Sequence, residues 1–204
     1  MTILLIRHGE TALNVARTLQ PAATPLSAHG IAQAEALAQR LARAGIGVIL
    51  ASDLPRAWQT AQALAAASGA ALQASALLHE RNFGDLRGLP YDTLGYNPLT
   101  MEAAPPGGES MQAFRSRVDA AFDATLALQA ITPGDVAIVT HGLVIRDLVL
   151  RRLQLSAGMT PPISIHNTSV TSFSALPPYA IELLDDMSHL GTGSGLQAGG
   201  LSGG

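Results

Sequence analysis

The sequence predicts an α/β protein built as a three-layer sandwich, with a mostly parallel central sheet and helices on both faces. Two observations support this fold class. Short apolar runs such as residues 3–6 and 135–140 have the composition of strands that are buried on both faces. Segments with apolar residues at helical spacing, such as residues 110–130, alternate with these runs along the chain. This alternation is typical of a parallel sheet covered by helices on both sides.

The first half of the chain is expected to begin with a strand at residues 3–6. A helix follows over residues 29–44 and ends at Gly45, a natural C-cap. Residues 47–52 form the second strand. Ser52 and Asp53 are good N-cap residues for the helix that runs through WQTAQALAAA, and Pro55 suits its first turn.

The remaining elements follow the same alternation. The segment ALLHE at residues 76–80 is expected to be the edge of a third strand, and the Gly- and Pro-rich residues 84–109 an irregular insertion. The helix over residues 110–130 is expected to carry Arg115 and Arg117 on its outer face. The last elements are a strand at 135–141, a helix at 143–153, and strands at 169–176 and 179–186. Residues 1–190 are predicted to form one domain, and the Gly-rich tail at 191–204 to be disordered.

Composition excludes several classes of chemistry. The chain has 204 residues, a net charge of −3 and 48% hydrophobic residues, which is typical of a globular domain without a nucleic-acid partner. All 12 basic residues are arginine and there is no cysteine, which rules out lysine Schiff bases, P-loop lysines and thiolate sites. The first apolar run lacks a basic flank and is too short for a signal peptide, and no run is long enough to cross a membrane. We therefore expect a cytoplasmic protein.

Polar side chains gather where the predicted strands end. Arg7 and His8 follow the first strand, and His141 ends the strand at 135–141. Arg56 lies shortly after the second strand, and Glu80 ends the third. Because the carboxyl ends of parallel strands meet at one edge of a sheet, these side chains are expected to face one ligand site.

This set of side chains suits a phosphoryl group. Guanidinium groups bind phosphate through two hydrogen bonds, and a neutral imidazole can act as a nucleophile. A carboxyl group can protonate the leaving oxygen; Glu80 is the first choice, and Glu10 and Glu109 are alternatives. His8 must be neutral to attack, with its other ring nitrogen donating to an acceptor such as a backbone carbonyl.

The motifs RHGET, SDLPRAWQTA, ERNFG, PGGES and VTHG, in this order, resemble those of the histidine phosphatase superfamily, in its phosphoglycerate-mutase-like branch. The resemblance covers residues 2–190. It implies a phosphorylated nucleophile at His8, a proton donor at Glu80, and a phosphate-binding pocket made by Arg7, Asn14, Arg56 and His141. It implies neither a metal nor a cofactor. One departure from the family pattern is Gln20-Pro21 with Ala23 at a position where the family has Asp, in a loop that borders the substrate.

Two other kinds of function are weaker alternatives. In a metal hydrolase, His79 and Glu80 would need a second histidine four positions after His79, and Phe83 stands there. A non-catalytic module that binds phosphorylated ligands would be expected to lack the nucleophile or the acid, and both are present.

Within the family, the choice lies between a mutase and a phosphatase. A mutase must hold the carboxylate of a phosphoglycerate, and after Arg87 the insertion contains no further arginine. Its apolar residues are expected to wall the site for a bulkier organic group: Leu86, Leu89, Tyr91, Leu94, Tyr96 and Met101. The sequence therefore favours a metal-independent phosphomonoesterase that acts through a phosphohistidine on a small phosphate ester, with a cofactor-dependent phosphoglycerate mutase as the alternative. Sugar phosphates, phosphoserine, nucleotides and α-ribazole phosphate are unranked as substrates, and nothing in the sequence indicates an oligomeric state.

Overall fold

Six strands form one mixed sheet in the computed structural model, which describes residues 1–191. The strands are β1 (Thr2–Arg7), β2 (Ile46–Ala51), β3 (Ala71–Ala74), β4 (Asp135–Thr140), β5 (Val170–Ser174) and β6 (Ile181–Asp186). Their spatial order is β3-β2-β4-β1-β5-β6. The pairs β3–β2, β2–β4 and β4–β1 are parallel, and β5 lies antiparallel to both β1 and β6. The predicted fold class, an α/β sandwich with a mostly parallel sheet, is confirmed.

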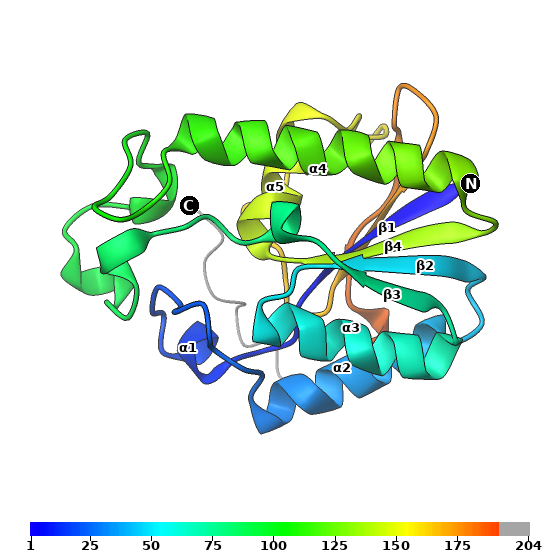
Figure 1. Cartoon of the computed structure of the whole chain (residues 1–204), viewed down its shortest axis with the longest axis horizontal. Coiled ribbons are helices and arrows are strands. Elements are labelled where there is room, and N and C mark those ends of the chain that lie inside the picture. The colour runs from blue at the N-terminus through cyan, green and yellow to red at the C-terminus, as the bar shows by residue number, and fades with distance from the viewer. Residues whose placement is uncertain (192–204) are drawn as a thin grey trace.

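Four long helices cover the two faces of the sheet (Figure 1). They are α2 (Ala28–Leu41) and α3 (Pro55–Ser68) on one face, and α4 (Met111–Ile131) and α5 (Gly142–Arg151) on the other. Ile3 and Leu5 of β1 belong to the core shared with α4 and α5. Leu4 and Ile6 belong to the core shared with α2 and α3. Successive strand residues point to opposite faces, so a strand covered on both sides must be apolar throughout.

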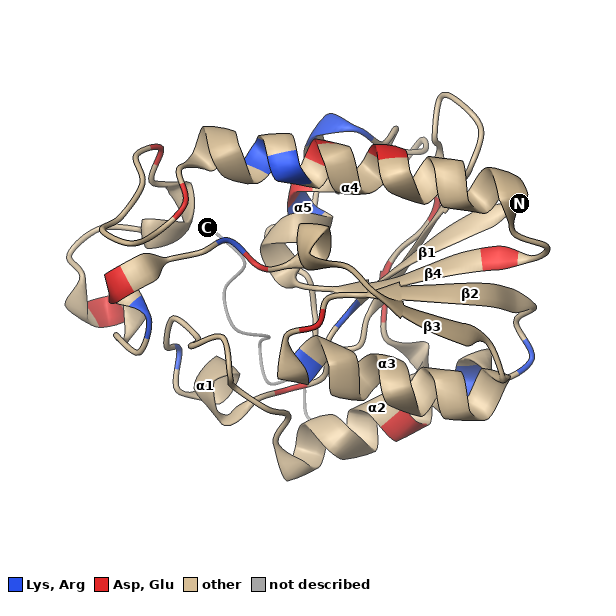
Figure 2. Cartoon of the chain, viewed as in Figure 1, with Lys and Arg blue, Asp and Glu red and all other residues tan. Residues whose placement is uncertain are grey.

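Figure 2 shows charged residues on α4 and around α5, which cover the same face of the sheet. Arg151 lies 3.1 Å from Asp119, and Arg152 lies 2.8 Å from Asp119 and 2.9 Å from Asp123. Such partly exposed pairs each contribute about 1 kcal/mol or less, so the apolar contacts beneath them dominate. Within residues 1–191, no helix is both long and apolar enough to span a membrane.

Most predicted elements occur within a few residues of their expected bounds. The insertion at 84–109 is irregular as predicted and contains three single-turn 3-10 helices, Gly84–Leu86, Tyr91–Thr93 and Pro98–Thr100. The helix predicted at 29–44 ends earlier, at Leu41, and Gly45 follows in the left-handed region with φ of 73°. Gly191 is the only residue of the predicted Gly-rich tail that the structure describes; the rest of it lies outside the described residues.

The prediction of a third strand at 76–80 is wrong. The third strand is β3, which is the sheet edge and is mostly exposed, so it lacks the apolar run that marks the buried strands. Gly69, with φ of 73°, ends α3 and turns the chain directly into β3. Residues Ala76–Leu78 form a 3-10 turn instead.

The prediction that Ser52 or Asp53 caps α3 is also wrong. The N-cap is Leu54, which has no side-chain capping bond, and Pro55 begins the helix as expected. The Ser52 side chain instead lies 2.9 Å from the ring of His141, and Asp53 forms a hydrogen bond with the ring of His79. Both polar groups that could have capped the helix are therefore engaged near the carboxyl ends of the strands.

Two glycines allow the loop after β1 to pack against the start of α2. A Cβ at Gly30 would lie 2.0 Å from the carbonyl oxygen of Glu10, and a Cβ at Gly9 would lie 2.5 Å from the carbonyl oxygen of Gly30. These distances are far shorter than van der Waals contact, so only glycine fits at either position. This close approach fixes the backbone directly after His8.

Candidate active site

The parallel pairing of β1 with β4 brings two histidine rings together. Arg7 is the register partner of Thr140, and the next backbone amide, that of His8, donates to the carbonyl of Thr140 at 3.0 Å. His141 follows Thr140 directly, and its ring centroid lies 5.2 Å from that of His8. Both histidines are buried.

The ring of His8 is held in one orientation. Its Nδ1 lies 2.7 Å from the carbonyl oxygen of Gly9, so Nδ1 carries the proton and donates it, and Nε2 keeps its lone pair. This confirms the predicted backbone acceptor. Burial lowers the pKa of His8 well below its usual value, and the charges of Arg56 and Arg7 lower it further. The imidazole is therefore neutral at physiological pH.

His141 stands at the head of α5 as its N-cap residue. Burial lowers its pKa well below the usual value, and Arg56 adds to this shift. Its Nε2 lies 2.9 Å from Ser52 Oγ, and its buried Nδ1 has no hydrogen-bond partner among the described residues.

Two buried guanidinium groups flank these rings. Arg7 ends β1 and donates from Nη1 to the carbonyl of Ile165. Arg56 lies in the first turn of α3, with Nη1 3.5 Å from the carbonyl of Pro21. Burial lowers the pKa of Arg56 to about 10, so it remains charged at neutral pH. The two positive charges and two neutral imidazoles suit a dianion.

Asn14 also faces this cavity, from the short helix α1 (Ala12–Val15). Its Oδ1 accepts hydrogen bonds from the amide and hydroxyl of Thr11, each at 3.1 Å. Because the side-chain oxygen is occupied, the NH₂ group is the part of Asn14 that can bind an anion.

Glu80 was predicted to end the third strand, and this is wrong. It follows the 3-10 turn at Ala76–Leu78. Its carboxylate accepts from the amide of Arg81 at 3.0 Å and from the amide of Leu143, in the first turn of α5, at 3.3 Å. Burial raises the pKa of Glu80, although the two amides and the charges of Arg56 and Arg7 oppose that shift. The carboxyl group can therefore carry a proton at a higher pH than an ordinary glutamate.

Five of the six predicted site residues line a single cavity of about 550 Å³. They are Arg7, His8, Asn14, Arg56 and Glu80; the sixth, His141, does not line the cavity, and its ring centroid lies 5.2 Å from that of His8. A second, more open cleft of about 1190 Å³ shares Leu54, Glu80 and Arg87 with it. The inner cavity and this outer cleft adjoin at these three residues.

The insertion contributes differently from the prediction. Of the six apolar residues expected to wall the site, Tyr91 alone lines either cavity, while Leu89 and Tyr96 are exposed. The apolar wall is instead made by Phe83, Leu99, Leu19, Leu54 and Leu143. Arg87 lines both cavities and forms no ion pair within the described residues. The start of the insertion therefore does place a cation over the site.

The loop that departs from the family pattern borders both cavities. Gln20 lines the inner cavity and its side chain lies 3.1 Å from the hydroxyl of Thr11. Ala22 lines the outer cleft, and the carbonyl of Pro21 contacts Arg56. Part of this loop therefore lies beside both cavities.

Both alternative acids have other hydrogen-bond partners, although Glu109 lines the outer cleft. Glu10 accepts from the hydroxyl of Ser27, the N-cap of α2, at 2.9 Å, and it lines neither cavity. Glu109 binds both edges of the Arg117 guanidinium, at 3.0 and 2.8 Å. Within residues 1–191, no cluster of three or more His, Asp or Glu side chains could hold a metal ion.

Residues 165–168 support the site, although no role was predicted for them. Asn167 Nδ2 donates to the carbonyl of His8 at 2.9 Å, and the amide of Thr168 donates to the carbonyl of Arg7 at 3.1 Å. Ile165 accepts from the Arg7 side chain. A motif could have flagged Asn167, but no local pattern shows that an irregular segment before β5 lies against the end of β1.

Comparisons with known proteins agree with this geometry. A sequence model of the histidine phosphatase superfamily (branch 1) matches residues 3–177, and the chain belongs to that superfamily. It is similar to a probable phosphoglycerate mutase GpmB of Yersinia pestis, with 34% identity over 93% of this chain and 95% of the relative.

Solved structures of related proteins include both reaction types. The α-ribazole phosphatase of Shigella flexneri has a TM-score of 0.76 at 27% identity, covering 92% of this chain and 97% of that one. A phosphoglycerate mutase from Bacillus anthracis has a TM-score of 0.79 at 26% identity, covering 93% and 95%. Relatives of this fold therefore include phosphatases and mutases, which share phosphoryl transfer.

We predict that the ion pair of His166 with Asp185, beside Asn167, makes stability depend on pH. The hydrogen bond that His166 Nδ1 donates to the Asp185 carboxylate raises the pKa of His166 above its usual value. The contribution of the His166–Asp185 pair to the free energy of unfolding is therefore complete below the unfolded-state pKa of about 6.5. It is lost as pH rises through the higher folded-state pKa. In urea unfolding, Asp185→Asn should cost about 1 kcal/mol more at pH 5 than at pH 8.5. The exposed Arg17–Asp92 pair supplies the control, since Asp92→Asn should show no such difference; an equal cost of Asp185→Asn at both pH values would contradict the prediction.

Proposed function

We propose that the chain is a metal-independent phosphomonoesterase that acts on a small organic phosphate through a phosphohistidine at His8. We further propose that residues 1–190 act as one catalytic domain. The observation that carries the proposal is the neutral, oriented ring of His8, whose free Nε2 shares a buried cavity with two guanidinium groups.

In the first step, Nε2 of His8 attacks phosphorus and the bond from phosphorus to the ester oxygen breaks. The proton of the Glu80 carboxyl group passes to the leaving oxygen, so an alcohol departs. Arg7, Arg56, Asn14 and His141 stabilise the charge on the three remaining phosphoryl oxygens.

In the second step, the Glu80 carboxylate accepts a proton from water as the water oxygen attacks phosphorus. The bond between phosphorus and Nε2 breaks and inorganic phosphate leaves. Glu80 is then protonated again and His8 is neutral, so the cycle is closed. The raised pKa of Glu80 supports both roles, because the group must bind and release a proton in each turnover.

The direct test measures phosphate release from p-nitrophenyl phosphate and a panel of metabolite phosphates, with His8→Ala as the comparison. We expect activity that survives EDTA, is blocked by vanadate, and is lost by at least about 1000-fold in His8→Ala. His29→Ala is a matched control, because His29 is exposed on α2 and away from both cavities. Activity that EDTA abolishes, or that survives in His8→Ala, would refute the proposal.

Glu80→Gln should discriminate between leaving groups. An alkyl phosphate needs a proton on its leaving oxygen, whereas p-nitrophenolate hardly does, so we expect a loss of about 100-fold for the first and about fivefold or less for the second. In the wild type, kcat for the alkyl ester should fall as pH rises through the raised pKa of Glu80, because the acid form is lost. That alkaline limb should be absent in Glu80→Gln. Equal losses for both substrates would assign the acid role to another group.

Phosphoglycerate mutase is a second candidate, favoured by Arg87 and by the 34% identical relative. A guanidinium at the junction of the two cavities could bind a substrate carboxylate. For the phosphatase we expect phosphate release without interconversion of 2- and 3-phosphoglycerate, as followed by NMR. Interconversion that Arg87→Gln abolishes while its phosphate release from p-nitrophenyl phosphate persists would establish the mutase instead.

A further inference from the structure

The segment that carries Glu80 is not itself part of a strand or an α-helix. β3 ends at Ala74, and after a single 3-10 turn the chain reaches Glu80 without a neighbouring strand. Instead, side chains from neighbouring elements hold the backbone of this segment. Arg117 Nη1 donates to the carbonyls of Leu77 and His79 at 2.9 and 2.7 Å, and Nη2 lies 3.5 Å from the carbonyl of Glu80. The Thr140 hydroxyl donates to the carbonyl between them, that of Leu78, at 2.7 Å.

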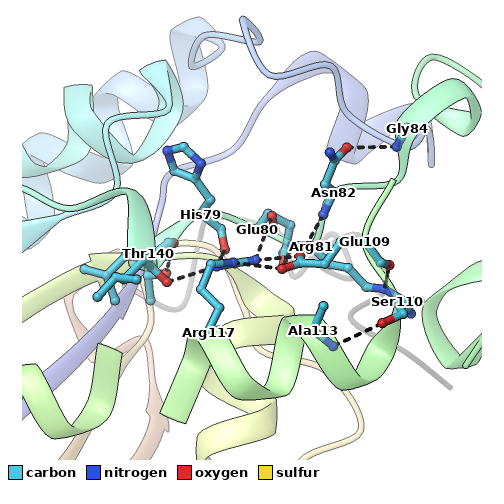
Figure 3. Close-up of polar contacts among 12 residues, drawn as sticks. His79, Glu80, Arg81, Asn82, Gly84, Glu109, Ser110, Ala113, Arg117 and Thr140 are labelled. Carbon is cyan, nitrogen blue, oxygen red and sulfur yellow. Dashed lines mark hydrogen bonds and ion pairs between the residues drawn. The ribbon is translucent and has the colours of Figure 1, made fainter. Parts of the chain in front are cut away.

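Arg117 is itself fixed by Glu109. The two carboxylate oxygens bind Nε and Nη2 at 3.0 and 2.8 Å, a bidentate pair in which both side chains are largely buried. Such a pair is both stronger and more directional than a single contact. The prediction that Arg117 lies on the outer face of its helix is therefore wrong: it points toward Glu80 (Figure 3).

Glu109 also forms hydrogen bonds with the two residues that follow Glu80. Its Oε2 accepts from the amide of Asn82 at 3.3 Å, its own amide donates to the carbonyl of Asn82 at 2.8 Å, and its carbonyl accepts from Arg81 Nε at 3.2 Å. The Arg117–Glu109 pair thus contacts the backbone both before and after Glu80 (Figure 3).

We infer that Arg117 and Glu109 are positioning residues that hold the Glu80 carboxyl group where it can reach the leaving oxygen. This inference rests on the proposed function of Glu80 as the acid. Proton transfer requires a donor within hydrogen-bond distance, so a shift of the Glu80 segment weakens catalysis without touching phosphate binding. His8, Arg7 and Arg56 come from other elements and do not depend on this pair.

The test compares Arg117→Ala with Arg115→Ala, a matched variant two residues away on α4 whose side chain pairs with Asp147 instead. Each is assayed with an alkyl phosphate and with p-nitrophenyl phosphate, alongside Glu80→Gln. In Arg117→Ala, we expect kcat for the alkyl ester to fall about 10- to 100-fold, with a change of about threefold or less for p-nitrophenyl phosphate and for vanadate inhibition. Arg115→Ala should leave both substrates unaffected.

Two milder variants cover the case in which Arg117→Ala fails to fold. Arg117→Lys keeps the charge but cannot bridge Glu109 and two carbonyls, and Glu109→Gln keeps the shape of the partner. Both should show the same selective loss, to a smaller degree, with thermal unfolding close to that of the wild type.

The possible outcomes separate the two proposals. Equal losses on both substrates in the folded Arg117 and Glu109 variants, or no loss on either, would overturn the positioning role. A Glu80→Gln variant without any leaving-group dependence would instead overturn the acid role of Glu80, and the positioning role with it. Selective loss in Glu80→Gln but not in the Arg117 variants would leave the acid in place and reject the inference alone.

Discussion

The parallel register of β1 and β4 is the constraint on which the rest of the site depends. Because Arg7 pairs with Thr140, the histidines that follow the two strands lie side by side, with ring centroids 5.2 Å apart. The same strand end supplies Thr140, which holds the Glu80 segment through the carbonyl of Leu78. A slip of one residue in either strand would turn the histidine after it toward the opposite face of the sheet, away from the other histidine. Packing on both faces, by α2 with α3 and α4 with α5, is what keeps that register.

Burial in the cavity favours the neutral form of each ionisable group. Burial lowers the pKa of His8, His141 and Arg56 and raises that of Glu80, so each group is pushed toward its neutral form. For the histidines this leaves a free lone pair, and for the glutamate a proton to give. The arginines remain charged because their ordinary pKa is so high. A dianion entering the cavity would therefore meet preorganised donors that need little rearrangement.

Sequence patterns predicted the parts of the molecule that depend on burial and on local order. Doubly buried strands and long helices were recognisable, and with them the strand ends that place Arg7, His8, Arg56 and His141. What the sequence could not predict depends on contacts between distant residues. The exposed edge strand β3 has no apolar run, Asn167 reaches His8 from far along the chain, and Arg117 has the spacing of a surface residue on α4. Ser52 and Asp53 are a further example, because their side chains bind the distant residues His141 and His79 and do not cap α3.

The contacts between Asn82 and Glu109 have a further consequence, because they join the two ends of the insertion. The Asn82 carbonyl accepts from the Glu109 amide, Asn82 Nδ2 donates to the carbonyl of Gly107 at 3.2 Å, and the amide of Asp85 donates to Pro106 at 2.9 Å. The residues between these contacts therefore form a loop whose two ends are joined by hydrogen bonds. The entropy of closing such a loop grows only slowly with its length. Arg87, Tyr91 and Leu99 lie within the segment that these contacts close and line the inner cavity, whereas Glu80 lies outside it, so changes in this segment would alter the cavity wall without changing the chain that carries Glu80.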